Sequence, residues 1–267
     1  MLKAPYWVYD GVNVLMGATT KTAEKMDRVK GKVAIVTGGA GGLGRAQARL
    51  LAKEGAKVVV TDTGVVQGKK VAQEINGQGG EAVFIQHDVS DETQWQKVIH
   101  DTLEQFGRLD ILVNNAGVMV WKKIEDTSLD EWRWLMGVNL DGVFLGTKHA
   151  MGAMKKTGGG SIINISSVAG IVGTLDTSAY HASKGGVRVF TKAAALECSK
   201  AGYDYNIRVN SIHPGVIKTP MVDELMKDEE KMKTALSWHP IGHFGEPEDI
   251  ANAVSYTHLT LPTKRIV

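Results

Sequence analysis

A tyrosine and a lysine, Tyr180 and Lys184, stand four residues apart in the segment YHASK. In a helix this spacing places both side chains on one face, one turn apart. A free tyrosine has a pKa of about 10 and is a poor acid–base catalyst at neutral pH. A neighbouring ammonium favours the phenolate and lowers that pKa, so the pair could exchange a proton with a substrate. Such a pair also occurs by chance on ordinary helix faces, and it gains meaning only from its surroundings.

A glycine-rich segment, TGGAGGLG, could bind a nucleotide. It follows the apolar run VAIVTG and opens a segment of helical period, with Gly38, Gly42 and Gly44 around Leu43. Glycines let the backbone approach a pyrophosphate closely, and a helix N-terminus supplies N–H groups and a partial positive charge. The alternative is a glycine-rich turn without a ligand. Its place between a strand and a helix favours a dinucleotide site.

An acidic residue, Asp62, ends the next apolar run, KVVVTD, eighteen residues after Gly44. A carboxylate at this place can accept hydrogen bonds from the adenosine ribose and repels a 2′-phosphate. No lysine or arginine lies inside the glycine loop or directly after Asp62. The sequence therefore favours NAD, with NADP less favoured. The alternative is an aspartate that only caps a turn.

Apolar runs of strand length alternate with segments of helical period and would position these residues. Continuous apolar strands that alternate with helices predict a parallel sheet covered on both faces. The sequence therefore predicts an α/β fold, a Rossmann-type doubly wound parallel sheet in a single domain. The expected strands are 33–38, 57–62, 82–88, 111–117, 161–167 and 207–215, with helices after the glycine loop and near 91–106, 129–155 and 178–201.

The composition excludes several classes of function. The chain has 267 residues, a formal net charge of +2 and one cysteine, Cys198. The absence of a basic run argues against nucleic-acid binding. One cysteine and scattered histidines build no metal site, and no apolar run reaches the ~20 residues of a membrane span. We expect a cytoplasmic protein with no metal, nucleic-acid or membrane partner.

Both ends of the chain look foreign to this scheme. Residues 1–25 precede a second methionine, Met26, and we expect them to form a disordered extension. The NAD-binding Rossmann domain is expected to span 26–256. Residues 257–267, THLTLPTKRIV, resemble translated adapter sequence more than protein. We therefore expect the last strand of the sheet to be missing.

The ordered motifs resemble those of short-chain dehydrogenases/reductases: TGxxxGxG, NNAG, an asparagine, a serine, YxxxK and a later PG. The likeness covers nearly the whole chain and is nearest to secondary-alcohol, cyclic-alcohol and hydroxysteroid dehydrogenases. It implies that Tyr180 is the general acid/base of hydride transfer and that Ser167 binds the substrate oxygen. It also implies that Lys184 lowers the tyrosine pKa and binds the nicotinamide ribose, and that Asn139 holds a water of a proton relay.

The same resemblance implies a row of cofactor contacts along one edge of the sheet. Asp88 and its neighbour would contact the adenine, NNAG would border the cofactor, and HPGVIKTP would cover the nicotinamide. The implied contacts are Gly38, Gly42, Leu43, Gly44, Asp62, Asp88, Val89, Asn115, Ala116, Gly117, Tyr180, Lys184, Pro214, Gly215, Ile217 and Thr219.

The resemblance also implies a substrate site of mostly apolar residues, formed by 118–120, 168–177 and a mobile lid over 221–243. The expected protein is an NAD-dependent oxidoreductase that interconverts a small apolar secondary alcohol and a ketone, and a homotetramer if its C-terminus is intact. One alternative is a reductase of 3-oxoacyl thioesters. Another is a non-catalytic dinucleotide-binding protein, because a fold alone does not guarantee activity.

Overall fold

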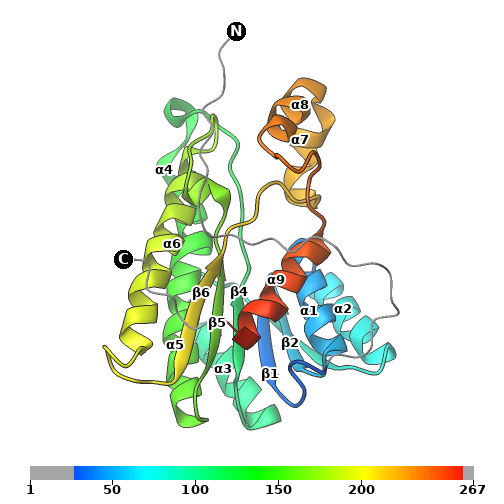
Figure 1. Ribbon diagram of the computed structural model, residues 1–267, viewed down its shortest axis with the longest axis vertical. Helices are drawn as coiled ribbons and strands as arrows, with labels where there is room; N and C mark the ends of the chain where they lie inside the picture. Colours follow the sequence, from blue (N-terminus) through cyan, green and yellow to red (C-terminus); the bar gives the residue numbers. More distant parts are fainter. Residues whose placement is uncertain (1–26, 261–267) are drawn as a thin grey trace.

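Six apolar runs form the strands of one parallel sheet (Figure 1). The computed structural model describes residues 27–260. The strand order is β3-β2-β1-β4-β5-β6, which confirms the predicted doubly wound parallel α/β fold. The strands are β1 (Val33–Thr37), β2 (Lys57–Asp62), β3 (Glu81–Gln86), β4 (Ile111–Asn114), β5 (Gly160–Ile165) and β6 (Ile207–Ile212).

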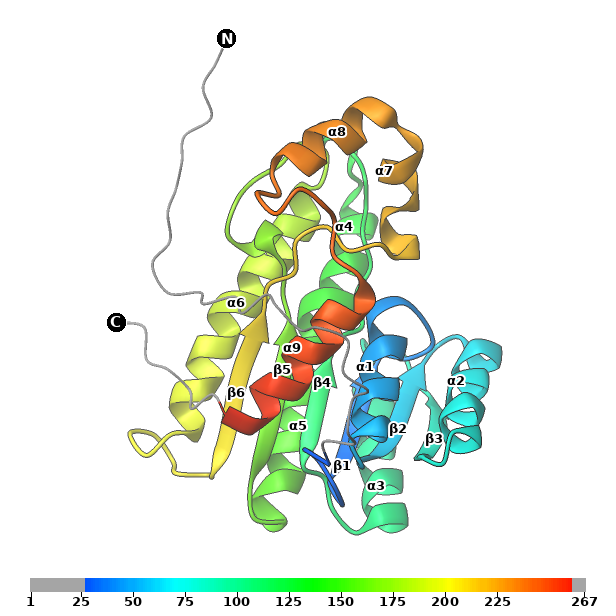
Figure 2. The same ribbon diagram turned by 45° about the vertical axis from the view of Figure 1, so that its right-hand side comes forward.

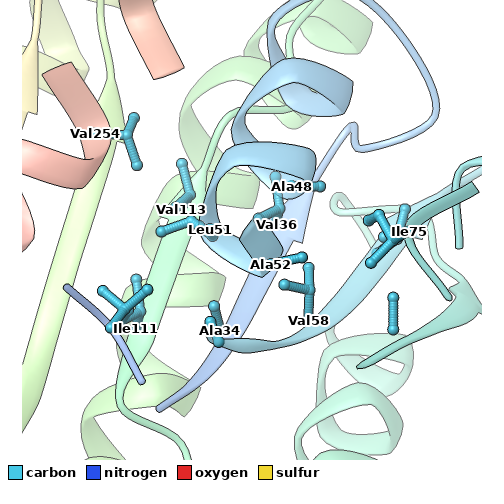
Figure 3. Close-up of a cluster of buried hydrophobic side chains, with 14 of the residues drawn as sticks. Ala34, Val36, Ala48, Leu51, Ala52, Val58, Ile75, Ile111, Val113 and Val254 are labelled. Atoms are coloured by element: carbon cyan, nitrogen blue, oxygen red, sulfur yellow. The ribbon is translucent and has the colours of Figure 1, made fainter. Parts of the chain in front are cut away.

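Helices cover both faces of the sheet (Figure 2). One face carries α1 (Gly42–Lys53), α2 (Val65–Gly77) and α9 (Pro247–Thr260), and the other carries α3 (Glu92–Phe106), α5 (Gly142–Lys156) and α6 (Ser178–Cys198). Figure 3 shows the first layer, where Leu51 of α1, Ile75 of α2 and Val254 of α9 meet the strands. Trp95 of α3 and Met154 of α5 are buried in the second layer.

The chain reverses its direction of winding at β1, which pairs with β2 on one side and β4 on the other. In open parallel sheets, ligands bind beyond the carboxyl ends of the strands at such a switch point. The glycine loop follows β1 and the NNAG motif follows β4. The topology therefore brings these two motifs to one crevice.

The lid residues form a separate small unit beyond the carboxyl ends of the strands (Figure 2). It contains the 3-10 turn η4 (Pro220–Val222) and the helices α7 (Asp223–Lys227) and α8 (Glu229–Ser237). Leu225, Ala235 and Phe244 form its own apolar cluster. Two further 3-10 turns, η1 (Ile124–Asp126) and η3 (Val168–Gly170), lie in loops above the sheet.

The structure differs from the expected elements at several places, and strands β4, β5 and β6 end two or three residues earlier than expected. Helix α2 is not among the helices expected from the sequence; Gly68 interrupts its apolar pattern, and a Cβ there would come within 2.0 Å of the Phe84 ring. Strand β3 ends two residues early, at Gln86, although the next residue, His87, still donates its N–H to the Asp62 carbonyl at 3.0 Å. The long helix expected over 129–155 is α4 (Leu129–Met136) and α5 joined by a π-helical turn, Gly137–Asp141.

The chain ends lie mostly outside the described residues. This holds for the expected extension 1–25 and for the end of the expected tail 257–267. The first four residues of that tail continue α9 to Thr260, and the Thr257 carbonyl accepts a hydrogen bond from Arg208 of β6 at 3.0 Å. Among the described helices, none is both long and apolar enough to cross a membrane.

Candidate active site

The glycine loop has a backbone that side chains would obstruct. Gly38 has a φ of +63°, and a Cβ there would lie 2.9 Å from the Ala116 Cα. A Cβ on Gly44 would lie 2.1 Å from the Gly38 carbonyl oxygen. These contacts hold the start of α1 against the loop after β4, and only glycine allows them.

The N-terminus of α1 fits an anionic group. Gly41 caps the helix without a side-chain hydrogen bond, and the first turn holds no acidic residue. A Cβ on Gly41 would meet nothing within 4 Å, so the backbone here faces open space. Helix N–H groups without side-chain acceptors bind phosphate well. The loop can therefore receive the pyrophosphate of a dinucleotide.

Asp62 supports the glycine loop from the end of β2. One carboxylate oxygen accepts a hydrogen bond from the Ala40 N–H at 3.0 Å, and the other accepts one from the Gly64 N–H at 2.9 Å. The turn-capping role that the sequence left open is therefore present. An ionised carboxylate offers about four acceptor positions, so these two bonds leave capacity for a ribose hydroxyl.

The NNAG motif joins the central strands. The Asn115 side chain donates to the Thr37 carbonyl at 2.9 Å, and the Asn115 N–H donates to the Thr37 hydroxyl at 2.9 Å. The Asn114 side chain donates to Asn164 of β5 at 2.9 Å. These bonds fix the ends of β1, β4 and β5 relative to one another at the crevice.

Asp88 and Val89 follow β3 at the same edge of the sheet. One Asp88 carboxylate oxygen accepts hydrogen bonds from the Ser90 N–H at 2.9 Å and the Ser90 hydroxyl at 2.7 Å. Val89 is buried, and its carbonyl accepts from the Trp95 indole N–H at 2.8 Å. The structure thus gives both residues a role in shaping the turn after β3.

Tyr180 and Lys184 lie one turn apart on α6, as their spacing predicts. Both are buried, with 9% of Tyr180 and 3% of Lys184 exposed. The Lys184 ammonium donates to the Ile165 carbonyl at 2.8 Å and lies 5.6 Å from the centre of the Tyr180 ring. The Ser166 hydroxyl donates to the Lys184 carbonyl at 2.9 Å. The end of β5 thereby holds this turn of α6 in place.

Burial dominates the electrostatics of this pair. It raises the pKa of the Tyr180 phenol, and a hydrogen bond with the Ser167 side chain lowers it by less. Burial also lowers the pKa of the Lys184 ammonium to about 8. The sequence predicts a lowered tyrosine pKa, and the protein groups produce the opposite direction. The reason is that the loss of hydration disfavours the phenolate more strongly than the Ser167 hydrogen bond favours it.

Ser167 lies where β5 meets the segment after β6. Its hydroxyl accepts from the Ala169 N–H at 3.1 Å and contacts the Pro214 carbonyl at 3.4 Å. The Val168 N–H donates to the same carbonyl at 3.0 Å. The structure therefore brings Ser167, Tyr180 and the PG motif together.

Asn139 occupies the π-helical turn and is fully buried. Its side-chain oxygen accepts from the Val118 N–H at 2.8 Å, and its amide donates to the Val118 carbonyl at 2.9 Å and to the Ser183 hydroxyl at 3.2 Å. A Cβ on Gly117 would lie 3.4 Å from the Lys184 ammonium and 3.5 Å from the Asn139 oxygen. The turn thus brings Asn139 beside the lysine.

The segment HPGVIKTP runs from β6 toward the lid. Ile217 forms an isolated parallel bridge with Gly245, so both stems of the lid meet here. Lys218 and Glu246 form an ion pair across the same stems. A Cβ on Gly42 would lie 3.6 Å from Thr219, so this segment borders the glycine loop.

Apolar side chains surround the catalytic candidates. Val118, Met119 and Val120 pack against the cluster that contains Tyr180. The loop after Ser167 exposes Val168, Ile171, Val172 and Leu175, and the last is 87% exposed. Exposed apolar groups next to a buried polar centre suit an apolar ligand.

Two histidines at this site were not singled out by the sequence. His181 accepts from the Thr174 N–H at 2.9 Å and contacts the Thr177 carbonyl at 2.8 Å, so it holds the loop after Ser167. His239 contacts the backbone of the HPGVIKTP segment. Each binds a backbone atom, and no spacing in the sequence reveals such a partner. Within residues 27–260, no His, Cys, Asp or Glu side chains gather as a metal site.

Comparison with known proteins gives concordant matches. A sequence model described as short chain dehydrogenase matches residues 32–230. The chain is 52% identical over 228 residues to the NADP-dependent (R)-specific alcohol dehydrogenase of Lentilactobacillus kefiri, covering 84% of this chain and 88% of that protein. It is 42% identical over 231 residues to the cyclopentanol dehydrogenase of Comamonas testosteroni, covering 86% and 91%. A crystal structure of a short-chain type dehydrogenase/reductase from Mycobacterium marinum superposes with a TM-score of 0.82 at 32% identity, covering 88% and 91%.

Proposed function

The chain belongs to the short chain dehydrogenase family, and we propose on that premise that it transfers hydride between NAD and a small apolar secondary alcohol or ketone, with Tyr180 as the acid/base. Membership of this family makes it an oxidoreductase of CH–OH groups. The observation that carries the proposal is the buried cluster of Tyr180, Ser167 and Lys184 beside an N–H-rich helix end.

In alcohol oxidation, the phenolate oxygen of Tyr180 would take the proton of the substrate hydroxyl while the carbinol carbon gives its hydride to the nicotinamide, so that the C–O bond becomes a carbonyl. Ser167, which hydrogen-bonds Tyr180, holds the same substrate oxygen through its hydroxyl. A bound oxidised nicotinamide supplies the hydride acceptor and a positive charge, which favours the phenolate. The raised pKa of Tyr180 keeps the phenol protonated for the reverse step, ketone reduction.

Lys184 and Asn139 support this centre. Lys184 is anchored by the Ile165 carbonyl at 2.8 Å, and its remaining N–H groups are available for the nicotinamide ribose. The side-chain atoms of Asn139 are engaged by Val118 and Ser183. We therefore assign Asn139 first to holding the Val118 backbone. A water-binding role would fall to its main chain.

The residues implied as cofactor contacts form a path along the carboxyl edge of the sheet. The glycine loop would take the pyrophosphate, Asp62 the adenosine ribose, and Asp88 with Val89 the adenine. Asn115, Ala116 and Gly117 would border the nucleotide on the side of β4. Pro214, Gly215, Ile217 and Thr219 would cover the nicotinamide.

We favour NAD over NADP because of the charge at Asp62. Residues 63–68 contain no lysine or arginine, and the nearby guanidinium of Arg45 is paired with the Glu74 carboxylate at 2.8 Å. A 2′-phosphate at the end of β2 would meet the negative charge of this carboxylate. The relative from Lentilactobacillus kefiri points the other way, since that enzyme is NADP-dependent.

We also propose that the chain forms a homo-oligomer, a tetramer. Apolar Phe144 of α5 and apolar Val189 and Leu196 of α6 are exposed on neighbouring helices. Exposed apolar groups of this kind favour contact with another subunit. Light scattering of the purified chain measures the assembly directly.

The test is the change in reduced-nicotinamide absorbance with the purified chain. Cyclopentanone, a bulkier aryl ketone and an acetoacetyl thioester are each supplied with NADH or NADPH. The proposal predicts ketone turnover above thioester turnover, and kcat/KM at least about tenfold higher with NADH. Preference for the thioester would favour the 3-oxoacyl reductase alternative, and preference for NADPH would overturn the cofactor assignment alone. The absence of turnover with every combination of substrate and nucleotide would contradict the proposed reaction.

A further inference from the structure

His239 joins the lid to the backbone after the PG motif. It follows α8 of the lid, and its Nε2 lies 3.0 Å from the Val216 backbone nitrogen. Its Nδ1 lies 2.8 Å from the Ala235 carbonyl oxygen, one helical turn back. The imidazole ring therefore bridges the end of the lid helix and the HPGVIKTP segment.

The two contacts define the protonation of the ring. The Ala235 carbonyl is an acceptor, so Nδ1 carries the hydrogen that it donates. The Val216 N–H is a donor, so Nε2 must offer its lone pair. Only the neutral Nδ1–H tautomer makes both bonds.

The surrounding residues accommodate this ring closely. A Cβ on Gly215 would lie 2.8 Å from the His239 Nε2, so the PG glycine leaves the space that the ring occupies. Phe244 packs edge-on against the ring, with centroids 5.3 Å apart. The Val216 carbonyl accepts from the Gly245 N–H at 3.1 Å. Val216 is thus held on its N–H by His239 of the lid and on its carbonyl by Gly245, just after the lid.

We propose that His239 is a positioning residue that couples the lid to the segment 214–219, and so sets the backbone that meets the nicotinamide ring. This rests on the proposed function for the identity of the ring. The bond from the Val216 N–H to His239 fixes the Gly215–Val216 peptide, and the bond from the Gly245 N–H to the Val216 carbonyl fixes the peptide that leads to Ile217. A lid that moves away from the site must release Val216, so lid position and nicotinamide binding are linked through this one bond.

The variants separate this bond from packing. His239→Phe keeps an aromatic ring against Phe244 and removes the acceptor. His239→Gln restores an oxygen acceptor near the place of Nε2. His239→Asn can still donate to Ala235 but is too short to accept from Val216, and it replaces the Phe variant if that one does not fold. His243→Phe is the matched control, because the His243 Nδ1 contacts the neighbouring Phe244 carbonyl rather than the segment 214–219.

The first readout is hydrogen exchange of the Val216 amide in the protein without nucleotide. Loss of one net hydrogen bond should speed this exchange by about two- to tenfold in His239→Phe. His239→Gln and His243→Phe should exchange like the wild type. Unchanged exchange in both His239→Phe and His239→Asn would refute the coupling, whether or not the protein is active.

The second readout is the Kd for NADH together with KM and kcat for the ketone. His239→Phe should raise Kd and KM by a similar about two- to tenfold factor, and His239→Gln should restore most of the loss. Faster exchange with unchanged Kd and KM would confine the bond to a structural role and overturn the proposed link to the nicotinamide. An inactive wild type would instead count against the proposed function.

Discussion

The ammonium nitrogen of Lys184 lies 2.8 Å from the carbonyl oxygen of Ile165, at the carboxyl end of β5. The strand thus fixes the lysine inside the protein, one turn from Tyr180. The same burial that places the ammonium there lowers its pKa to about 8. The buried ammonium therefore destabilises the folded protein while it places a cation beside the proposed acid/base.

Replacing the lysine should make the protein more stable and inactive. Below a pH of about 8 the buried ammonium is charged in the folded chain, so Lys184→Met should raise the free energy of unfolding near neutral pH by about 1–3 kcal/mol. The pKa of Lys184 in the folded chain lies below the ordinary value of 10.5, so the free energy of unfolding of the wild type should rise between pH values of about 8 and 10.5. The stability difference between the wild type and Lys184→Met should therefore close over that range. Urea unfolding at several pH values measures this. A less stable Lys184→Met protein would contradict it.

The carboxylate of Asp62 should control the choice of nucleotide. Asp62→Asn keeps an acceptor for one of the two loop N–H groups and removes the charge. We expect the ratio of kcat/KM with NADPH to that with NADH to rise about ten- to hundredfold, the size of a charge-assisted hydrogen bond. Asp204→Asn, in the exposed turn before β6, is the control. An unchanged ratio would remove Asp62 from cofactor selection.

His87 should make the fold sensitive to mild acid. Burial lowers the pKa of its imidazole from 6.5 to about 4, outweighing the raising effect of Asp88 and Asp91. The unfolded chain therefore binds an extra proton in this range, and stability is lost as the pH falls from about 6.5 to about 4. His87→Phe keeps a ring beside Trp95, and its free energy of unfolding should fall by about 2–3 kcal/mol less than that of the wild type over that pH range. Equal losses in both proteins, followed by chemical unfolding, would show that His87 does not carry the effect.

The sequence predicts the strands, the order of the motifs and the helical spacing of Tyr180 and Lys184. These features are local: continuous apolar runs mark strands, and a spacing of four marks one helix face. It does not predict the π-helical turn at Asn139, whose side chain hydrogen-bonds the Val118 backbone. It also does not predict that burial raises the pKa of Tyr180 in the protein without nucleotide, because burial depends on the whole fold.

Contacts with backbone atoms are the least visible in the sequence. His239 and Val216 are 23 residues apart, and neither residue type indicates that the two form a hydrogen bond. Helix α2 is likewise not apparent in the sequence, because Gly68, which lies against the Phe84 ring, interrupts its apolar pattern. The domain limits, the cytoplasmic location, the tetramer and the roles of the site residues stay predictions.

The most direct test of the account is Tyr180→Phe, compared with Tyr203→Phe, which removes the hydroxyl of an exposed tyrosine. Kinetics with a ketone and NADH, and NADH binding by fluorescence titration, are measured for both. The account predicts that Tyr180→Phe lowers kcat/KM by about 10²–10⁴-fold, since a positioned acid is lost, while the Kd for NADH stays close to that of the wild type. Wild-type turnover in Tyr180→Phe would contradict the assignment of Tyr180 as the acid/base.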